Sequence, residues 1–153
     1  MNPIAERLAR QDVIVLDGAL ATELEARGCS ISDALWSAKA LFACPDLVRE
    51  VHLDYLRAGA DVVTSASYQA TVEGFMRCGF TEAEAAALLQ KSVRLAREAC
   101  ELYCSERGVD GGVPLVAASV GPYGAYLADG SEYRGDYDVE EDALTAFHAQ
   151  RLR

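Results

Sequence analysis

The tripeptide Asp17-Gly18-Ala19 contains residue types that could bind an amino acid. It directly follows the apolar run 13–16, at the point where a strand would pass into a helix. A carboxylate there could accept a substrate ammonium group, and the N–H groups of Gly18 and Ala19 near a helix N-terminus could bind a substrate carboxylate. Alternatively, Asp17 could cap the helix while Gly18 only shapes the turn. Position alone leaves both interpretations open.

Aromatic residues are concentrated in the segment 121–137, which contains four tyrosines. Together with Trp36, these rings could form the wall of a pocket for a cation such as a sulfonium or a quaternary ammonium, each face contributing about 0.5–2 kcal/mol. The alternative is that the rings pack this segment against the rest of the protein. For any single ring, the sequence slightly favours the packing interpretation.

Other common chemistries have little support in the sequence. Gly121-x-x-Gly124 does not match a phosphate-binding loop. Cys100 and Cys104 would share a helix face, but no further cysteine or histidine pair completes a four-ligand metal set. The two histidines, His52 and His148, do not lie near a serine or cysteine in a nucleophile motif, so they are expected to be core or surface residues. The residues alone therefore leave the reaction open.

Alternating elements predict an α/β protein with a parallel sheet. We expect buried strands at 13–16, 61–66 and 114–119, and helices at 19–27, 46–58, 81–108 and from about residue 139 onward. The third helix has the strongest signal, because Thr81-x-x-Glu84 forms a capping box. Long segments follow the strands, at 29–44, 67–80 and 120–137. In parallel α/β proteins such segments build the active site.

Composition limits the classes of partner. The chain has 153 residues with 24 acidic and 14 basic side chains, a formal net charge of −10. A binder of nucleic acid or of an anionic membrane needs a basic face, so neither partner is expected. No apolar stretch reaches the ~20 residues that span a bilayer, and no secretory signal is visible, which predicts a cytoplasmic protein. The five cysteines are expected to be reduced thiols.

The C-terminal end of the sequence predicts an incomplete fold. No glycine, asparagine or proline terminates the last helix, and three parallel strands would leave an edge strand and apolar surface uncovered. We therefore expect that the chain is truncated within the helix starting near residue 139. The alternative is a compact three-layer domain whose last helix frays.

Five segments in order resemble the homocysteine S-methyltransferase family, and in particular the branch that uses S-methylmethionine. They are residues 16–25 (Leu-Asp-Gly-Ala-Leu-Ala-Thr-Glu-Leu-Glu), 35–38 (Leu-Trp-Ser-Ala), 67–71 (Ser-Tyr-Gln-Ala-Thr), 119–125 (Ser-Val-Gly-Pro-Tyr-Gly-Ala) and 129–135 (Asp-Gly-Ser-Glu-Tyr-Arg-Gly). The resemblance extends from about residue 12 to residue 153. Several motifs in order are more specific than any one of them.

This resemblance implies a (β/α)₈ TIM barrel, of which residues 1–153 would form the N-terminal part with about three βα units. In the family, zinc binds homocysteine as a thiolate, which attacks the methyl group of a sulfonium donor, S-methylmethionine or S-adenosylmethionine, and gives methionine. The resemblance assigns the homocysteine amino-acid head to Asp17, Gly18 and Ala19. It further assigns the lining of the donor or homocysteine pocket to Trp36, Ser67, Tyr68, Gln69 and Tyr123.

The sequence departs from the family at the metal. The family's zinc ligands are cysteines in a Gly-x-Asn-Cys and a Gly-Gly-Cys-Cys segment, and neither segment is present. No zinc ligand and no catalytic residue is therefore predicted in this chain, and the isolated chain is predicted to be inactive. One alternative is a non-catalytic half-barrel that self-associates through its exposed strand edge or pairs with a complementary half. Another is a related betaine- or folate-dependent homocysteine methyltransferase.

Overall fold

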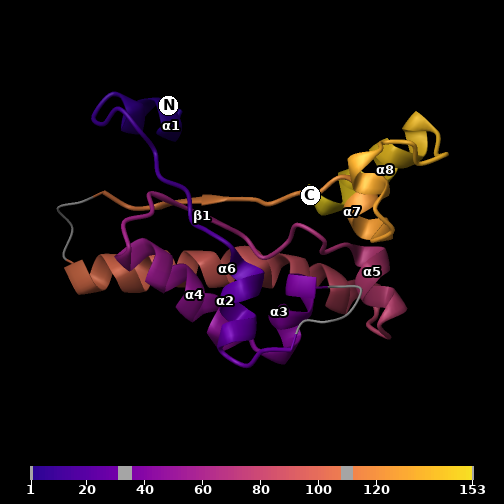
Figure 1. Ribbon diagram of the computed structural model, residues 1–153, viewed down its shortest axis with the longest axis horizontal. Helices are drawn as coiled ribbons and strands as arrows, with labels where there is room; N and C mark the ends of the chain where they lie inside the picture. The colour runs from indigo at the N-terminus through magenta and orange to yellow at the C-terminus, as the bar shows by residue number, and fades with distance from the viewer. Residues whose placement is uncertain (1, 31–35, 108–111, 153) are drawn as a thin grey trace.

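A computed structural model describes residues 2–30, 36–107 and 112–152 (Figure 1). The α-helices are α1 (Pro3–Leu8), α2 (Leu20–Ala26), α3 (Ala40–Ala43), α4 (Pro45–Arg57), α5 (Val72–Arg77), α6 (Glu82–Arg107), α7 (Tyr123–Leu127) and α8 (Glu141–Arg151). Two 3₁₀ turns, η1 (Trp36–Lys39) and η3 (Ser131–Tyr133), and two strands, β1 (Val62–Thr64) and β2 (Leu115–Ala117), complete the described elements. None of the described helices is both long enough and apolar enough to cross a membrane.

The sheet is parallel, as predicted. β1 and β2 pair in parallel with Val63 opposite Val116. The segment 13–17 lies on the other side of β1, where Leu16 forms a parallel bridge with Val62 and the Asp17 N–H donates to the Val62 carbonyl at 2.9 Å. The predicted strands at 61–66 and 114–119 are thus confirmed, although both are shorter than predicted. The α/β fold class with parallel strands is confirmed.

The prediction that segment 13–16 is a strand buried on both faces is wrong. It forms only a bridge to β1, and Val13, Val15 and Leu16 are 67%, 49% and 62% exposed. The physical reason is that helices cover the length of the strands on one side only. Helices α2, α4 and α6 lie along one side of the strands, while α1, α7 and α8 lie near the ends of the other side (Figure 1). β2 is likewise only half-buried along its length.

The core lies between the helices and the covered side of the sheet. α4 packs along α6 and contributes buried residues to two apolar clusters. The first cluster is built from residues of α2 to α6, among them Leu24, Leu41, Val48, Phe75 and Leu88. The second joins α4, β1 and α6 through Leu56, Val63, Ala96 and Ala99, among others. The predicted helix at 46–58 is confirmed as α4. Its buried residues pack against α6 and β1.

The helix ends follow the predicted local signals in two cases. The Thr81 N–H donates to Glu84 Oε2 at 2.8 Å, and the Glu84 N–H donates to Thr81 Oγ1 at 3.3 Å, which is the reciprocal pattern of a capping box. α6 is described to Arg107, and the predicted end at Gly108 lies outside the described residues. α2 ends before Gly28, which has a φ of +82° suited to a C-terminal glycine.

The last helix begins later than predicted. α8 starts at Glu141, after Glu140, whose side chain makes no capping hydrogen bond, and Asp138 has a φ of 49°. Glu140 has extended backbone angles (φ −65°, ψ 149°), so the helix cannot begin before residue 141. The short helices α3, α5 and α7 lie inside the long segments that follow helices and strands, and the sequence did not predict them. Helices of four to six residues are too short to show a helical period.

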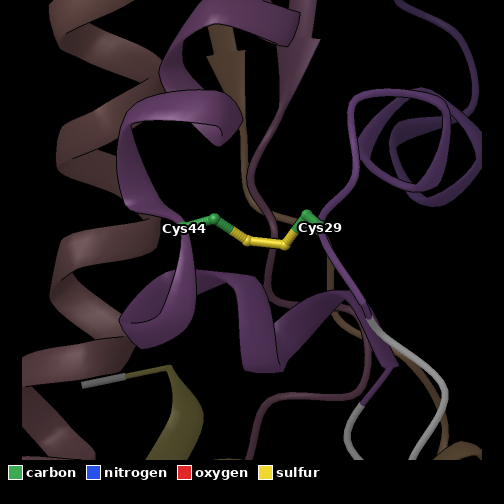
Figure 2. Close-up of a disulfide and its surroundings, with 2 residues drawn as sticks. All are labelled: Cys29 and Cys44. Carbon is green, nitrogen blue, oxygen red and sulfur yellow. A yellow bond between two sulfur atoms is a disulfide. The ribbon is translucent and has the colours of Figure 1, made fainter.

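Two of the five cysteines form a disulfide. Cys29, just after α2, is joined to Cys44, just before α4 (Figure 2), and their Cα atoms lie 6.4 Å apart, within the usual range for a disulfide. The prediction of reduced thiols is therefore wrong for this pair, because fold geometry brings together two residues whose spacing carries no disulfide signature. Cys78, Cys100 and Cys104 are free thiols.

Candidate functional site

The carboxyl ends of the three parallel segments lie side by side, because Leu16, Val62 and Leu115 are in register across the sheet. Asp17 follows the first segment and Thr64 ends β1. The loop after β2 begins at Ala118 and carries Ser119. This edge of the sheet therefore collects the residues that the sequence assigned to a binding site. They fall into two groups, one around Asp17 and one around the loops that follow β1 and β2.

Asp17 is held by β1. Its Oδ2 accepts a hydrogen bond from the Thr64 N–H at 2.8 Å, and its Oδ1 accepts one from the Thr64 hydroxyl at 2.9 Å. The side chain is 5% exposed. Asp17 does not cap α2, because Ala19 occupies the N-cap position and no side chain hydrogen-bonds there. The carboxylate thus has a fixed orientation, and the first N–H groups of α2 have no side-chain cap.

Gly18 is required by the close approach of α4. A Cβ atom at this position would lie 2.8 Å from the Tyr55 hydroxyl oxygen and 2.8–2.9 Å from two of its ring carbons. The same hydroxyl donates to the Ala19 carbonyl at 3.2 Å. Burial and the charges of Glu23 and Asp17 raise the pKa of Tyr55, so the phenol keeps its proton as a donor. Tyr55 therefore supports the turn that follows the first parallel segment.

His52 lies one helical turn before Tyr55 on α4 and also faces Asp17. Its Nδ1 is 3.9 Å from Asp17 Oδ2, and the residue is 1% exposed. Neither ring nitrogen has a hydrogen-bond partner within the part of the chain that the structure describes. Burial lowers the pKa of His52 to about 4, and the Asp17 charge opposes this only in part. The imidazole is therefore neutral at pH 7.

Ser67 ties the loops after β1 and β2 together. Its hydroxyl shares a 2.6 Å hydrogen bond with the Ser65 hydroxyl and donates to the Ser119 carbonyl at 2.9 Å. The Ser119 N–H in turn donates to Ser65 Oγ at 3.0 Å. Ser67 also lines a groove of about 870 Å³ between α6, the loop after β2 and α8, whose lining does not include Asp17. In this structure its hydroxyl thus has a bridging role.

Tyr68 and Gln69 point to the segment after β2. The Tyr68 hydroxyl donates a hydrogen bond to a Glu132 carboxylate oxygen, and this contact together with burial raises the pKa of Tyr68 to about 12. Gln69 Nε2 donates to the Ala125 carbonyl at 3.5 Å. Tyr68 is 40% exposed, and its hydroxyl lies beside the acidic side chain of Glu132.

Tyr123 lies in an aromatic cluster. Its ring centroid is 5.6 Å from that of Tyr126, 5.7 Å from that of Tyr137 and 5.0 Å from that of Phe147. The cluster joins α7 to α8 and matches the packing interpretation of the tyrosine-rich segment. Among the described residues, the ring contacts of Tyr123 do not include Thr64 or His52, the side chains next to Asp17.

Arg151, near the end of α8, connects the same loops. Its guanidinium donates to the Gly121 carbonyl at 2.8 Å, the Ser67 carbonyl at 3.0 Å and the Tyr68 carbonyl at 2.8 Å. Burial lowers the pKa of Arg151. One side chain therefore fixes the loop after β1 relative to the loop after β2.

The described residues do not fit a zinc site. They contain no group of three or more His, Cys, Asp or Glu side chains that could hold a metal ion. Cys29 and Cys44 are joined to each other, and Cys100 and Cys104 lie on α6. Trp36, the remaining predicted pocket residue, begins η1, but its side chain lies outside the described part of the chain.

The structure adds four residues that sequence reasoning did not assign to the site: His52, Tyr55, Thr64 and Arg151. Thr64 could have been found, because it lies within the predicted strand 61–66, which neighbours the segment that carries Asp17. His52 and Tyr55 share a helix face at a spacing of three, but only the docking of α4 directs that face at Asp17. Arg151 has no local signal.

Comparison with known proteins places these features in a family. A model of the homocysteine S-methyltransferase family matches residues 14–153. Homocysteine S-methyltransferase of Escherichia coli K12 is 59% identical over 151 residues, which cover 99% of this chain and 48% of that protein. Homocysteine S-methyltransferase YbgG of Bacillus subtilis 168 is 53% identical over 155 residues, which cover 100% of this chain and 49% of that protein.

Comparison with solved structures leads to the same family. The metallated form of the homocysteine methyltransferase MmuM from Escherichia coli has a TM-score of 0.93 and 59% identity, and the match covers 99% of this chain and 52% of that chain. The chain therefore spans about half the length of the relatives it matches. Since the family model covers nearly all of the sequence, the chain belongs to the homocysteine S-methyltransferase family.

Proposed function

We propose that this chain supplies the amino-acid-binding part of a homocysteine S-methyltransferase built as a (β/α)₈ barrel. The observation that carries the proposal is the orientation of Asp17, whose carboxylate is held by Thr64 at the carboxyl end of its strand, beside the uncapped start of α2. The carboxylate would receive the homocysteine ammonium group. The N–H groups of Gly18 and Ala19 would receive its carboxylate.

The reaction of the whole enzyme would be methyl transfer from a sulfonium donor, S-methylmethionine or S-adenosylmethionine. A lone pair of the homocysteine thiolate forms the new bond to the methyl carbon, and the electrons of the broken carbon–sulfur bond return to the donor sulfur, which leaves as a neutral thioether. A neutral leaving group needs no general acid. The partly exposed Tyr68, with the Glu132 carboxylate at its hydroxyl, would suit the positive sulfonium.

Zinc is the metal that the resemblance implies for whole members of the family. Because the described residues offer no ligand set, we assign no step at the metal to this chain. We propose that the metal ligands belong to the part of the family enzymes that this chain does not span. The isolated 153-residue chain should then bind the amino acid without turning it over.

A binding experiment tests the amino-acid site. Titration of the chain with L-homocysteine, followed by ¹⁵N NMR, should shift the N–H signals of Gly18 and Ala19. Asp17→Asn should weaken binding at least about tenfold, because it removes the charge that attracts the ammonium group. Asp46→Asn is the matched control, since Asp46 is exposed on α4 and pairs only with Arg49 among the described residues. Equal affinities of the two variants would refute the proposal.

A turnover experiment tests the proposal that this chain binds the amino acid but does not contain the complete catalytic site. The purified chain, incubated with homocysteine, S-methylmethionine and zinc, should form no methionine above the uncatalysed background. Methionine production that depends on the chain would show that the complete catalytic site lies within these 153 residues.

Self-association is a second candidate role, favoured by the exposure of Val13, Val15 and Leu16 on the partly paired segment beside β1. An edge segment with exposed apolar side chains can pair with another chain. Two copies would cover each other's open sheet. Sedimentation equilibrium of the folded chain should then show a dimer, and a monomer at all accessible concentrations would exclude this role.

A further inference from the structure

His52 is a buried polar residue that lies beside Asp17, and nothing described so far explains why this position holds a histidine. Its ring is 1% exposed, and neither nitrogen is hydrogen-bonded within the described part of the chain. Buried polar atoms almost always have a partner, because an unsatisfied one carries its full desolvation cost. The neighbouring inward residues of α4, Val48, Val51 and Leu56, are apolar. An apolar side chain at position 52 would fill the same space without this cost, so packing alone does not account for histidine.

The surroundings of His52 indicate what the histidine serves. Nδ1 lies 3.9 Å from Asp17 Oδ2, and Asp17 is the charged group that acts on the imidazole. One turn further along α4, Tyr55 packs against Gly18 and donates to the Ala19 carbonyl. Two side chains of one helix face thus contact the same three-residue turn. Their common target is the segment that carries Asp17.

We propose that His52 is a positioning residue for Asp17, which directs a neutral Nδ1–H at the carboxylate and holds it as the receptor for the ammonium group of an amino-acid substrate. This inference rests on the proposed function, since it assumes that Asp17 binds the ammonium group. Thr64 already donates to both carboxylate oxygens. A further donor at Oδ2 would leave one lone pair, on Oδ1, for the substrate.

The donor proposed for Asp17 is neutral, so it orients the carboxylate without cancelling its charge. An arginine or lysine at this place would hold the carboxylate equally well but would cancel its charge. Burial keeps the pKa of His52 near 4, so the imidazole adds no charge at pH 7. Asp17 is then oriented by neutral donors alone and keeps a full negative charge for the ammonium group. A cationic partner would weaken that attraction.

The test compares two ligands on the 153-residue chain: L-homocysteine and 4-sulfanylbutanoate, which is the same molecule without its amino group. In the wild-type chain homocysteine should bind at least about tenfold more tightly. His52→Leu should reduce this preference about tenfold while leaving the affinity for 4-sulfanylbutanoate within twofold of wild type. His52→Asn should restore most of the preference, because the asparagine amide can place an N–H close to the position of Nδ1. His148→Leu, which changes the other histidine, should behave as wild type.

The outcomes separate this inference from the proposed function. If the wild-type chain does not prefer homocysteine, Asp17 is not an ammonium receptor, and both fail. If the wild-type chain discriminates and His52→Leu keeps the full preference, only the role of His52 is overturned. An equal loss of affinity for both ligands would mark a purely structural residue and would also overturn it.

A second measurement covers the case in which His52→Leu does not fold. ¹⁵N NMR of the wild-type imidazole should show the Nδ1–H tautomer, and Asp17→Asn should shift the Nδ1 resonance. An Nε2–H tautomer, or an Nδ1 signal that ignores the change at Asp17, would contradict the proposed contact.

Discussion

Lowering the pH from 7 to 4 should destabilise this chain through His52. The buried imidazole has a pKa of about 4 in the folded chain against 6.5 in the unfolded chain, because burial disfavours its charged form. The unfolded chain therefore binds a proton more readily than the folded chain. Stability contributed by the neutral histidine is complete above pH 6.5 and is lost progressively as the pH falls from 6.5 to 4.

The size of this loss follows from the two pKa values. A tenfold difference in proton affinity corresponds to about 1.4 kcal/mol, so the full loss from this histidine amounts to about 3 kcal/mol. About 2 kcal/mol of it should be lost by pH 5, where most unfolded molecules but few folded ones carry the proton. A domain of this size has a total stability of roughly 5–15 kcal/mol, so the loss is easily measured.

Urea unfolding at pH 7, 6, 5 and 4 provides the assay, applied to wild type, His52→Leu and the control His148→Leu. Other groups titrate in the same range, so the informative quantity is the difference in unfolding free energy between wild type and His52→Leu. This difference should shift by about 2 kcal/mol against wild type between pH 7 and pH 5. The control should keep the pH slope of wild type. Parallel curves for wild type and His52→Leu would refute the assignment of a depressed pKa to the buried imidazole.

Three substitutions test other parts of the structure by the same unfolding assay at pH 7. Gly18→Ala should cost about 1–3 kcal/mol, because the new Cβ would overlap the Tyr55 ring, and an unchanged stability would mean that α4 does not contact the turn. Thr81→Ala should cost about 1 kcal/mol by removing the cap of α6, and no loss would argue against the capping box. Arg151→Met should cost about 2 kcal/mol of stability, because three backbone carbonyls lose a charged donor. The control Arg134→Met, on an exposed loop, should change stability by no more than about 0.5 kcal/mol. Equal effects of the two substitutions would contradict the bridging role of Arg151.

The elements predicted correctly are those whose signals are local. The capping box at Thr81 and the period of α6 can be seen within a few residues of sequence. The apolar runs at 61–66 and 114–119 likewise predict strands from composition alone. Placement of Asp17 at the end of the first parallel segment followed from the same reasoning, because the turn lies next to that segment in the sequence.

What the sequence did not predict depends on contacts between distant segments. The exposure of Val13 is set by which helices cover the sheet, and the Cys29–Cys44 disulfide is set by the docking of α2 against α4. His52 was expected to be a core or surface residue, and it is buried. No sequence pattern indicates that its helix face meets Asp17, thirty-five positions earlier. The role of Tyr123 in an aromatic cluster depends similarly on Phe147, which comes from the following helix.

Two aspartates of this chain differ in the charge of their surroundings, and this difference supports our proposal that Asp17 binds the substrate ammonium group. Asp61, just before β1, accepts from the Arg7 guanidinium at 2.8 Å and from the Val15 N–H at 2.9 Å, and these donors lower its pKa, the Val15 N–H most of all. Its charge is balanced within the protein, so Asp61 links α1 to the sheet. Asp17, at the opposite end of the same strands, accepts hydrogen bonds from the neutral N–H and hydroxyl groups of Thr64, and the buried His52 ring lies 3.9 Å away. An anion held in place but not neutralised retains its attraction for a cation, and an amino-acid ammonium group is the cation that this family's substrate supplies.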